Sequence, residues 1–211
     1  MPEIPVPFFP NQAFAWTFCG MLLALLVIAA FIDLRRQIVP KWLSLTTLAL
    51  GVTWNVVRGA WLGSQGLETW RLGSHGAWIG AADGFLFALA GFLTGFGAFF
   101  FMWIVGACGG GDVKIFAATS SWVGPYMSLW IMVLSTLMLI VLLGLKLGTL
   151  FLIRGPKAPV PRSADKNVKA PLARDPRLAR GMTYALPLAL ATALALVWFF
   201  RVDLDLVGLW H

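Results

Sequence analysis

Long apolar runs constrain the fold of this chain more than any other feature of its sequence. A membrane-spanning helix needs about 20 predominantly apolar residues. Apolar runs near or above that length cover approximately residues 13–32, 42–62, 77–105, 126–153 and 181–201, and a shorter one covers 113–124. Only 12% of the 211 residues are charged, against about a quarter in an ordinary soluble domain. The sequence therefore predicts an all-α membrane protein with about six transmembrane helices.

The basic residues indicate how these helices are oriented. The net charge is +7, and most lysines and arginines lie in three of the connecting segments, at 33–41, 106–114 and 154–180. The positive-inside rule places such segments in the cytoplasm. We therefore expect the N-terminus outside, a basic cytoplasmic loop over about 154–180, and location in a bacterial inner membrane. Interleaved basic and aromatic residues of a nucleic-acid surface are missing, so no nucleic acid is expected as a partner.

The cysteines favour neither a metal site nor a disulfide framework. Cys19 lies inside the first apolar run and Cys108 follows the third. The chain has no CxxC pair and no Cys/His cluster, which are the usual sequence signs of a zinc site. We expect both cysteines to fill apolar space, and we expect neither a metal nor a cofactor.

Two aspartates lie at corresponding ends of different apolar runs. Asp33 follows the first run, and Asp112 precedes the fourth, so the predicted topology places both at the cytoplasmic face. A carboxylate near hydrocarbon is costly, by about 2.5–3.5 kcal/mol at a helix centre. Two carboxylates that face each other cannot both ionise easily, so one can activate a water while the other donates a hydrogen bond to a carbonyl. The pair predicts aspartic peptidase chemistry.

The expected helix ends indicate a division of labour between the two aspartates. Asp33 would lie at a helix C-terminus, whose negative dipole end favours the protonated acid. Asp112 would lie at a helix N-terminus, where free N–H groups favour the anion. We therefore expect Asp33 to act as the acid and Asp112 as the base in the resting state.

Glycines precede Asp112 in the stretch "GACGGGDVKIF" (106–116). Because glycine has no Cβ, Gly109, Gly110 and Gly111 could adopt unusual φ/ψ values and let an extended substrate backbone approach closely. A plain turn between helices is the alternative interpretation. Other glycines repeat at a spacing of four, which predicts close helix–helix packing. These pairs are Gly80 and Gly84, Gly91 and Gly95, and Gly144 and Gly148.

Two of these segments carry a resemblance to a known family. "GGGDVK" (109–114) is similar to the GxGD motif of prepilin peptidases, the type IV leader peptidases. "DLRRQIVPKWL" (33–43) resembles the family's other aspartate motif through Asp33, Arg35, Val39 and Pro40, and departs from it at Lys41, where asparagine is usual. "GMTYALPLALA" (181–191), which contains Tyr184, resembles a late Pro-Tyr-Gly segment of the family. Presenilin and signal peptide peptidase share the GxGD motif.

The resemblance implies a polytopic GxGD aspartic endopeptidase with Asp33 and Asp112 as catalytic residues. Such an enzyme removes the short basic leader of a prepilin-like precursor at the cytoplasmic face, before the precursor's hydrophobic helix. The chain resembles the short, peptidase-only members of Flp/Tad pilus systems. A single membrane peptidase domain over 1–211, without a methyltransferase domain or N-methylation activity, is therefore expected.

Several other polar residues have weaker predicted roles. Lys114, Arg35, Pro40 and Tyr184 could support the site, although Lys114 and Arg35 could equally serve membrane orientation. Asp83 lies in the third apolar run near its outer end, where a structural polar contact is the expected role. Three alternatives to a prepilin peptidase stay open. They are another GxGD intramembrane protease, a non-catalytic scaffold of pilus assembly, and a transporter or proton relay that uses intramembrane carboxylates.

Overall fold

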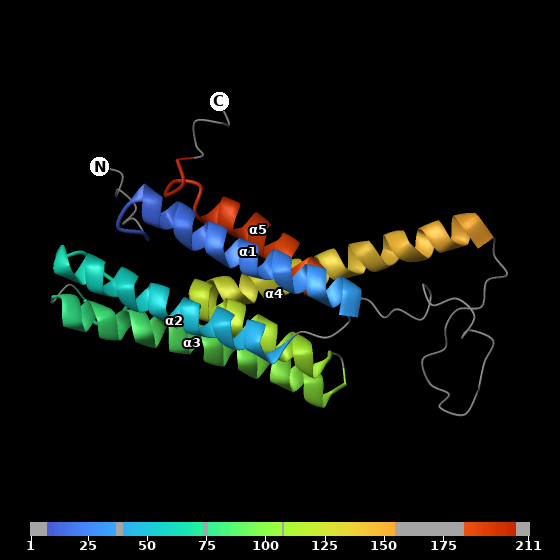
Figure 1. The fold of residues 1–211 in the computed structure, drawn as a ribbon, viewed down its shortest axis with the longest axis horizontal. Helices are drawn as coiled ribbons and strands as arrows, with labels where there is room; N and C mark the ends of the chain where they lie inside the picture. Colours follow the sequence, from blue (N-terminus) through green and yellow to red (C-terminus); the bar gives the residue numbers. More distant parts are fainter. Residues whose placement is uncertain (1–7, 37–39, 74–75, 107, 155–183, 206–211) are drawn as a thin grey trace.

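The computed structural model describes residues 8–36, 40–73, 76–106, 108–154 and 184–205. Within these ranges the fold is entirely helical, with no strand. The helices are α1 (Gln12–Arg36), α2 (Lys41–Ser64), α3 (Ala77–Ile104), α4 (Gly110–Arg154) and α5 (Ala185–Phe199). Figure 1 shows them as a bundle of roughly antiparallel rods, and the all-α prediction is confirmed.

The helix starts follow local sequence chemistry. Asn11 precedes α1, and its side-chain oxygen accepts a hydrogen bond from the Phe14 N–H at 2.7 Å, as an N-cap residue does. Pro40 precedes α2 with φ −61° and ψ 140°, an extended conformation that proline adopts readily. The predicted runs at 13–32, 42–62 and 77–105 therefore correspond closely to α1, α2 and α3.

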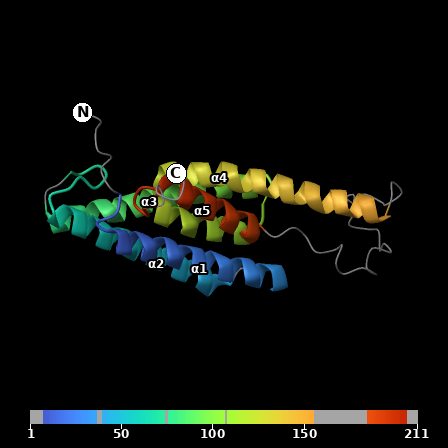
Figure 2. The same ribbon diagram turned by 90° about the horizontal axis from the view of Figure 1, so that it is seen from above.

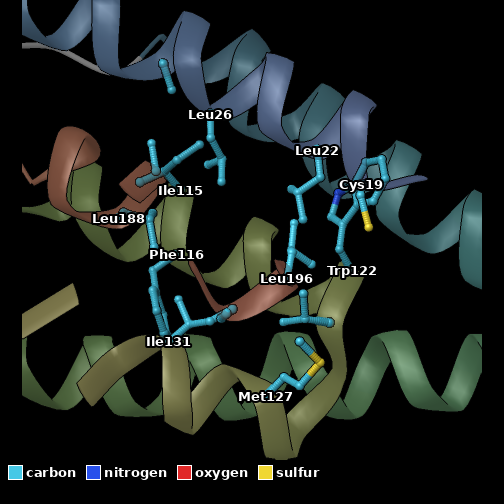
Figure 3. Packing of buried hydrophobic residues seen from close by; sticks show 14 of the residues in the cluster. Cys19, Leu22, Leu26, Ile115, Phe116, Trp122, Met127, Ile131, Leu188 and Leu196 are labelled. Carbon is cyan, nitrogen blue, oxygen red and sulfur yellow. The ribbon is translucent and has the colours of Figure 1, made fainter. Parts of the chain in front are cut away.

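Helix α4 contains the two runs predicted at 113–124 and 126–153, and it breaks between them. Gly124 has φ 76° and ψ 177°, which is not helical, and Pro125 follows. The chain reverses at this point, so that the segments 110–123 and 125–154 run back along each other (Figure 1). In Figure 3, Phe116 and Ile131 from these two segments lie beside each other in the core. The outer part of α4 then extends past the end of α1 (Figure 1).

The expectation of six full spans is only partly met. Three of the described helical segments are long and apolar enough to cross a membrane: Gln12–Arg35, Ala77–Ile104 and Gly110–Leu145. Helix α5 has 15 residues, about 22 Å at 1.5 Å per residue, which is shorter than the 30 Å hydrocarbon core of a typical bilayer. The composition and these spans are those of an integral membrane protein. The predicted basic loop lies outside the described residues beyond Arg154.

Glycine contacts hold α2, α3 and α4 close together. A Cβ on Gly80 would lie 2.1 Å from the Gly59 carbonyl oxygen, and one on Gly84 would lie 2.1 Å from the Asn55 carbonyl oxygen. A Cβ on Gly91 would lie 2.2 Å from the Ser120 carbonyl oxygen, and one on Gly95 would meet the Ser120 side chain. Packing through the first two predicted glycine pairs is thus confirmed. The prediction is wrong for Gly144 and Gly148: a Cβ added at either would meet no other described part of the protein within 4 Å, because this part of α4 extends beyond the bundle.

The hydrophobic core lies where α5 packs between α1 and α4 (Figure 2). Cys19 and Leu22 of α1 face Trp122 of α4 and Leu196 of α5 in this core (Figure 3). Cys19 is buried there, as predicted for an apolar filler. This packing fixes α5 against α1, and it therefore sets where the start of α5 lies relative to the end of α1.

Candidate active site

Asp33 lies in the last turn of α1 and is buried, with 6% of its surface exposed. Its carboxylate Oδ2 accepts a long hydrogen bond from the Ala185 N–H, at 3.4 Å. Ala185 is the first residue of α5, and the first N–H groups of a helix have no partner within the helix. The Asp33 carboxylate therefore lies at the N-terminus of α5, although 152 residues separate the two in sequence.

Asp112 lies in the first turn of α4 and is partly exposed. Its Oδ2 accepts a hydrogen bond from the Gly109 N–H at 3.0 Å, and the Gly109 carbonyl accepts one from the Asp112 N–H, also at 3.0 Å. This reciprocal pair resembles a capping box, in which an acidic or amide side chain at the third helical position reaches back to the N-cap backbone. The bond fixes the carboxylate at the start of the helix.

The fold brings the two carboxylates together at one end of the bundle. Asp33 and Asp112 lie within range of a direct electrostatic interaction. The end of α1, the start of α4 and the start of α5 all point to this end (Figure 1). Because α1 and α4 are separate helices, their meeting here depends on tertiary packing. The arrangement can place one ionised and one protonated carboxyl on the same reacting group.

The structure removes one premise of the predicted division of labour. Asp112 lies at a helix N-terminus as expected, but Asp33 lies both at the end of α1 and against the N-terminus of α5. The positive end of a helix dipole therefore faces each carboxylate. The two aspartates differ in solvent exposure rather than in helix dipole, since Asp33 is buried and Asp112 is partly exposed.

The glycines before Asp112 do not adopt unusual backbone conformations. Gly109, Gly110 and Gly111 all lack a positive φ, so this part of the prediction is wrong; the positive φ in the stretch belongs to Gly106, at 79°. A Cβ on Gly110 would meet only Trp103 Nε1, at an ordinary 3.7 Å. Nothing in the described protein therefore forbids a small side chain at Gly110, whose Cβ would pack at an ordinary distance from Trp103.

The predicted supporting residues have different surroundings. Lys114 and Arg35 are exposed, and the Arg35 guanidinium lies over the Phe31 ring, 4.3 Å from its centroid. Among the described contacts, none joins Lys114 or Arg35 to either aspartate. Pro40 serves as the N-cap residue of α2. Tyr184 differs from these, because it is buried and directly precedes Ala185, the residue that contacts Asp33.

Cys108, near the site, and Asp83, far from it, both have structural contacts. Cys108 donates a hydrogen bond to the Phe99 carbonyl at 3.4 Å. Burial, and then the charge of Asp112, raise the pKa of the Cys108 thiol, which disfavours a thiolate nucleophile. Asp83 is fully buried far from Asp112 along α3, and its carboxylate accepts hydrogen bonds from the Arg71 and Leu72 N–H groups and from the Thr69 hydroxyl. The structural role predicted for Asp83 is confirmed.

Sequence reasoning missed four residues around the site: Phe99, Phe116, Ser135 and Ala185. Phe99 stacks on Phe116, with ring centroids 4.1 Å apart. Phe116 lies one helical turn after Asp112. Ser135 forms a hydrogen bond with the Tyr184 hydroxyl, and Ala185 donates to Asp33 through its backbone. A serine in an apolar helix and a backbone N–H carry no sequence signal of such contacts, so only the tertiary structure reveals them.

The fold and this site define an all-helical membrane protein with a pair of interacting carboxylates at one end of its bundle. A sequence model of the type IV leader peptidase family matches residues 20–152, which include both aspartates. The match covers more than half of the chain, and the chain therefore belongs to the type IV leader peptidase family. Comparison with curated proteins and with solved structures gives no significant match. Family membership makes the protein a peptidase of the leader-peptidase type.

Proposed function

We propose that the protein is a membrane aspartic endopeptidase that removes the short basic leader from prepilin-like precursors. The observation that carries this proposal is the approach of Asp33 and Asp112 within electrostatic range at one end of the bundle. Paired carboxylates suffice for peptide hydrolysis by general acid–base catalysis. Family membership supports a leader peptide as the substrate.

The proposed mechanism assigns the two carboxyl groups by their access to solvent. Asp112 is partly exposed, so its carboxylate can reach a water and take a proton from it. The water oxygen then forms a bond to the carbonyl carbon of the scissile peptide. Asp33, which is buried, donates its proton to the carbonyl oxygen, giving a neutral tetrahedral diol. The C–N bond breaks when Asp112 passes its proton to the departing nitrogen and a hydroxyl proton of the diol returns to Asp33.

The proposed membrane arrangement follows the charge distribution. The end of α1 carries Arg35 and Arg36, and the start of α4 carries Lys114, on the side of the aspartates. We assign this side to the cytoplasm of a bacterial inner membrane, with the N-terminus outside, as the positive-inside rule requires. The six helical segments, with α4 counted as two, would then cross or enter the bilayer, and the leader would be cut at the cytoplasmic face.

Processing of a prepilin-like substrate tests the proposal. Wild type, Asp33→Asn and Asp112→Asn are each expressed with a precursor, and the cleaved fraction is measured in membranes at equal protein levels. We expect each variant to lose about 10²-fold or more in cleavage rate, the usual contribution of a positioned acid or base. Asp205→Asn, an exposed aspartate after α5, serves as the matched control. Full processing by Asp33→Asn or Asp112→Asn would exclude the aspartic mechanism.

The same experiment distinguishes the peptidase from a scaffold or a proton relay. A scaffold would keep its role in both asparagine variants, because asparagine has nearly the shape of aspartate. Mass spectrometry of the new N-terminus further tests the expectation that this chain cleaves but does not methylate. An N-methylated product formed by the purified protein would contradict that expectation.

A further inference from the structure

Tyr184 directly precedes the residue that contacts Asp33, and the proposed mechanism gives it no role. The residue is buried, with 9% of its surface exposed. Its hydroxyl lies 2.5 Å from the Ser135 hydroxyl, and the phenol lies within electrostatic range of Asp112. The next residue, Ala185, donates its N–H to Asp33. The dipeptide at the start of α5 thus bonds Asp33 through Ala185 and lies within electrostatic range of Asp112 through Tyr184.

Aromatic packing connects the same tyrosine to the helix that carries Asp112. The Tyr184 ring lies 5.2 Å from the Phe99 ring, measured between centroids. Phe99 stacks on Phe116, one helical turn after Asp112, and its carbonyl accepts the bond from Cys108 in the preceding loop. Tyr184 is therefore held on one side by α3 and the first segment of α4. Ser135 holds its hydroxyl from the second segment of α4.

Ser135 has no other evident reason to be buried at this place. It is fully buried on the 125–154 segment, and its hydroxyl also approaches the Met132 carbonyl at 3.0 Å within the same helix. A helix-internal bond of this kind needs no tertiary partner, since the neighbouring Thr136 makes one to Met132 while exposed. The bond to Tyr184 joins the second segment of α4 to the residue that precedes α5.

We propose that Ser135 and Tyr184 form a positioning pair that holds the N-terminus of α5 against Asp33 and so sets the geometry of the carboxyl pair. Neither residue needs to touch the substrate. The pair acts because fixing the tyrosine hydroxyl fixes the start of α5, and with it the Ala185 N–H that contacts Asp33. This inference rests on the proposed peptidase function for its kinetic test, but not for its spectroscopic one.

The kinetic test compares Ser135→Ala, Tyr184→Phe and the double variant. We expect each single variant to lower kcat by about tenfold or more, since small displacements of catalytic groups are costly, while KM changes little. Because the two hydroxyls act through one bond, the double variant should lose no more than either single variant. The pH dependence of kcat should also shift, which simple loss of stability would not cause.

Ser128→Ala is the matched control. Ser128 is buried on the same segment of α4, but among the described residues its hydroxyl bonds only the Gly124 carbonyl. We expect its kcat and pH profile to stay close to those of wild type. If Ser135→Ala behaves like Ser128→Ala, or if the losses in Ser135→Ala and Tyr184→Phe simply add, the positioning pair is refuted. Retained cleavage in Asp33→Asn would instead refute the peptidase mechanism itself.

A spectroscopic test needs no substrate and uses the folded wild type. The chain has only two tyrosines, so ring-¹³C tyrosine gives two signals, and Tyr126→Phe identifies that of Tyr184. We expect the Tyr184 signal to move with pH as the aspartates titrate, to lose most of this movement in Asp112→Asn, and to change position in Ser135→Ala. A Tyr184 signal that is indifferent to both Asp112→Asn and Ser135→Ala would overturn the inference.

Discussion

The two aspartates illustrate how far single residues explain this site. Asp112 is fixed by its own neighbours, because its carboxylate caps the helix that it begins, through Gly109. Asp33 is buried and has a partner from a distant helix, the Ala185 N–H. The local arrangement of Asp112 follows from the sequence 109–112 alone, whereas the surroundings of Asp33 exist only when α5 has docked on α1.

Gly110→Ala tests why glycines precede Asp112. Gly110 has no positive φ, and an added Cβ would meet only Trp103 at an ordinary distance. We therefore expect the variant to fold with an unchanged thermal midpoint in detergent, and alanine is if anything the better helix former. If the space beside Gly110 admits the substrate backbone, KM for a prepilin-like substrate should rise by about tenfold or more.

Gly97→Ala provides the control for that variant. Gly97 lies on α3, and an added Cβ would meet no atom within 4 Å. Its kinetics should match those of wild type. An unchanged KM in Gly110→Ala would mean that the glycine serves only as part of a turn, the alternative that the sequence left open.

At the scale of elements, the break in α4 organises the bundle. A 45-residue helix would extend about 67 Å, far beyond the thickness of a bilayer. The break at Gly124 lets α4 return, so that residues from both of its segments lie near Tyr184. Phe116, before the break, stacks on Phe99, whose ring in turn packs against the Tyr184 ring. Ser135, after the break, bonds the Tyr184 hydroxyl directly. The site therefore depends on this reversal.

Gly124→Ala should disrupt the reversal. Alanine is strained at φ 76° and ψ 177°, a region that glycine alone adopts readily. Its Cβ would also lie 2.1 Å from the Phe87 ring. We expect a loss of about 2–5 kcal/mol in the free energy of unfolding, measured by denaturant titration in mixed micelles. Gly144→Ala, where the Cβ has open space, should be neutral; equal stability of the two variants would contradict this explanation.

Asn55 of α2 compensates for the backbone groups that this break exposes. Pro125 has no N–H, so the Ser121 carbonyl loses its helical donor. The buried Asn55 amide donates to the carbonyls of Ser121 and Trp122, each at 3.0 Å. Asparagine in an apolar run thus has a structural role here that its position in the sequence did not indicate.

Asn55→Leu should therefore destabilise the protein although it makes α2 more apolar. A buried acceptor left without a donor costs about 1–3 kcal/mol, and we expect a loss of that size in the free energy of unfolding in mixed micelles. Thr53→Val is the control, because Thr53 is exposed and bonds only the Ala49 carbonyl in its own helix. A gain of stability in Asn55→Leu would show that the two carbonyls find other donors.

At the scale of the whole molecule, the bundle has two distinct ends. The connection from α3 to α4 lies at the end that holds the aspartates, and the connection from α2 to α3 lies at the opposite end (Figure 1). The opposite end also carries the first and last described residues, where the Phe9 and Phe200 rings lie 4.8 Å apart. This arrangement agrees with a topology in which both termini lie on one side.

Single cysteines can test which side faces the cytoplasm. In a background with Cys19→Ser and Cys108→Ser, we expect Gln65→Cys, exposed just after α2, to react with a membrane-impermeant maleimide in intact cells whose outer membrane is permeabilised. Lys157→Cys, in the basic segment 154–180, should react only after the inner membrane is opened. The reverse pattern of labelling would invert the proposed orientation and place the aspartates outside.

The sequence alone determined the positions of most helices and the end of the bundle at which the aspartates lie. Apolar length placed α1, α2 and α3 within a few residues, because hydropathy acts locally. The boundary between the predicted runs 113–124 and 126–153 located the break in α4, where Gly124 and Pro125 interrupt the helix. The alternation of runs and basic segments also put Asp33 and Asp112 at one end of the bundle. What the runs could not determine was whether each is a full span: α5, with 15 residues, is shorter than the predicted run 181–201, and the segment 110–123 is short for a full span, as its predicted run was.

Only the tertiary structure decided how the helices face one another. Whether Gly80 meets Gly59 while Gly144 meets nothing depends on the rotation and tilt of whole helices, which a spacing of four does not encode. The same holds for the Ser135–Tyr184 bond and for the Ala185 N–H on Asp33. These contacts join residues far apart in the chain. They are selected by packing energy summed over many side chains, so no short sequence motif predicts them.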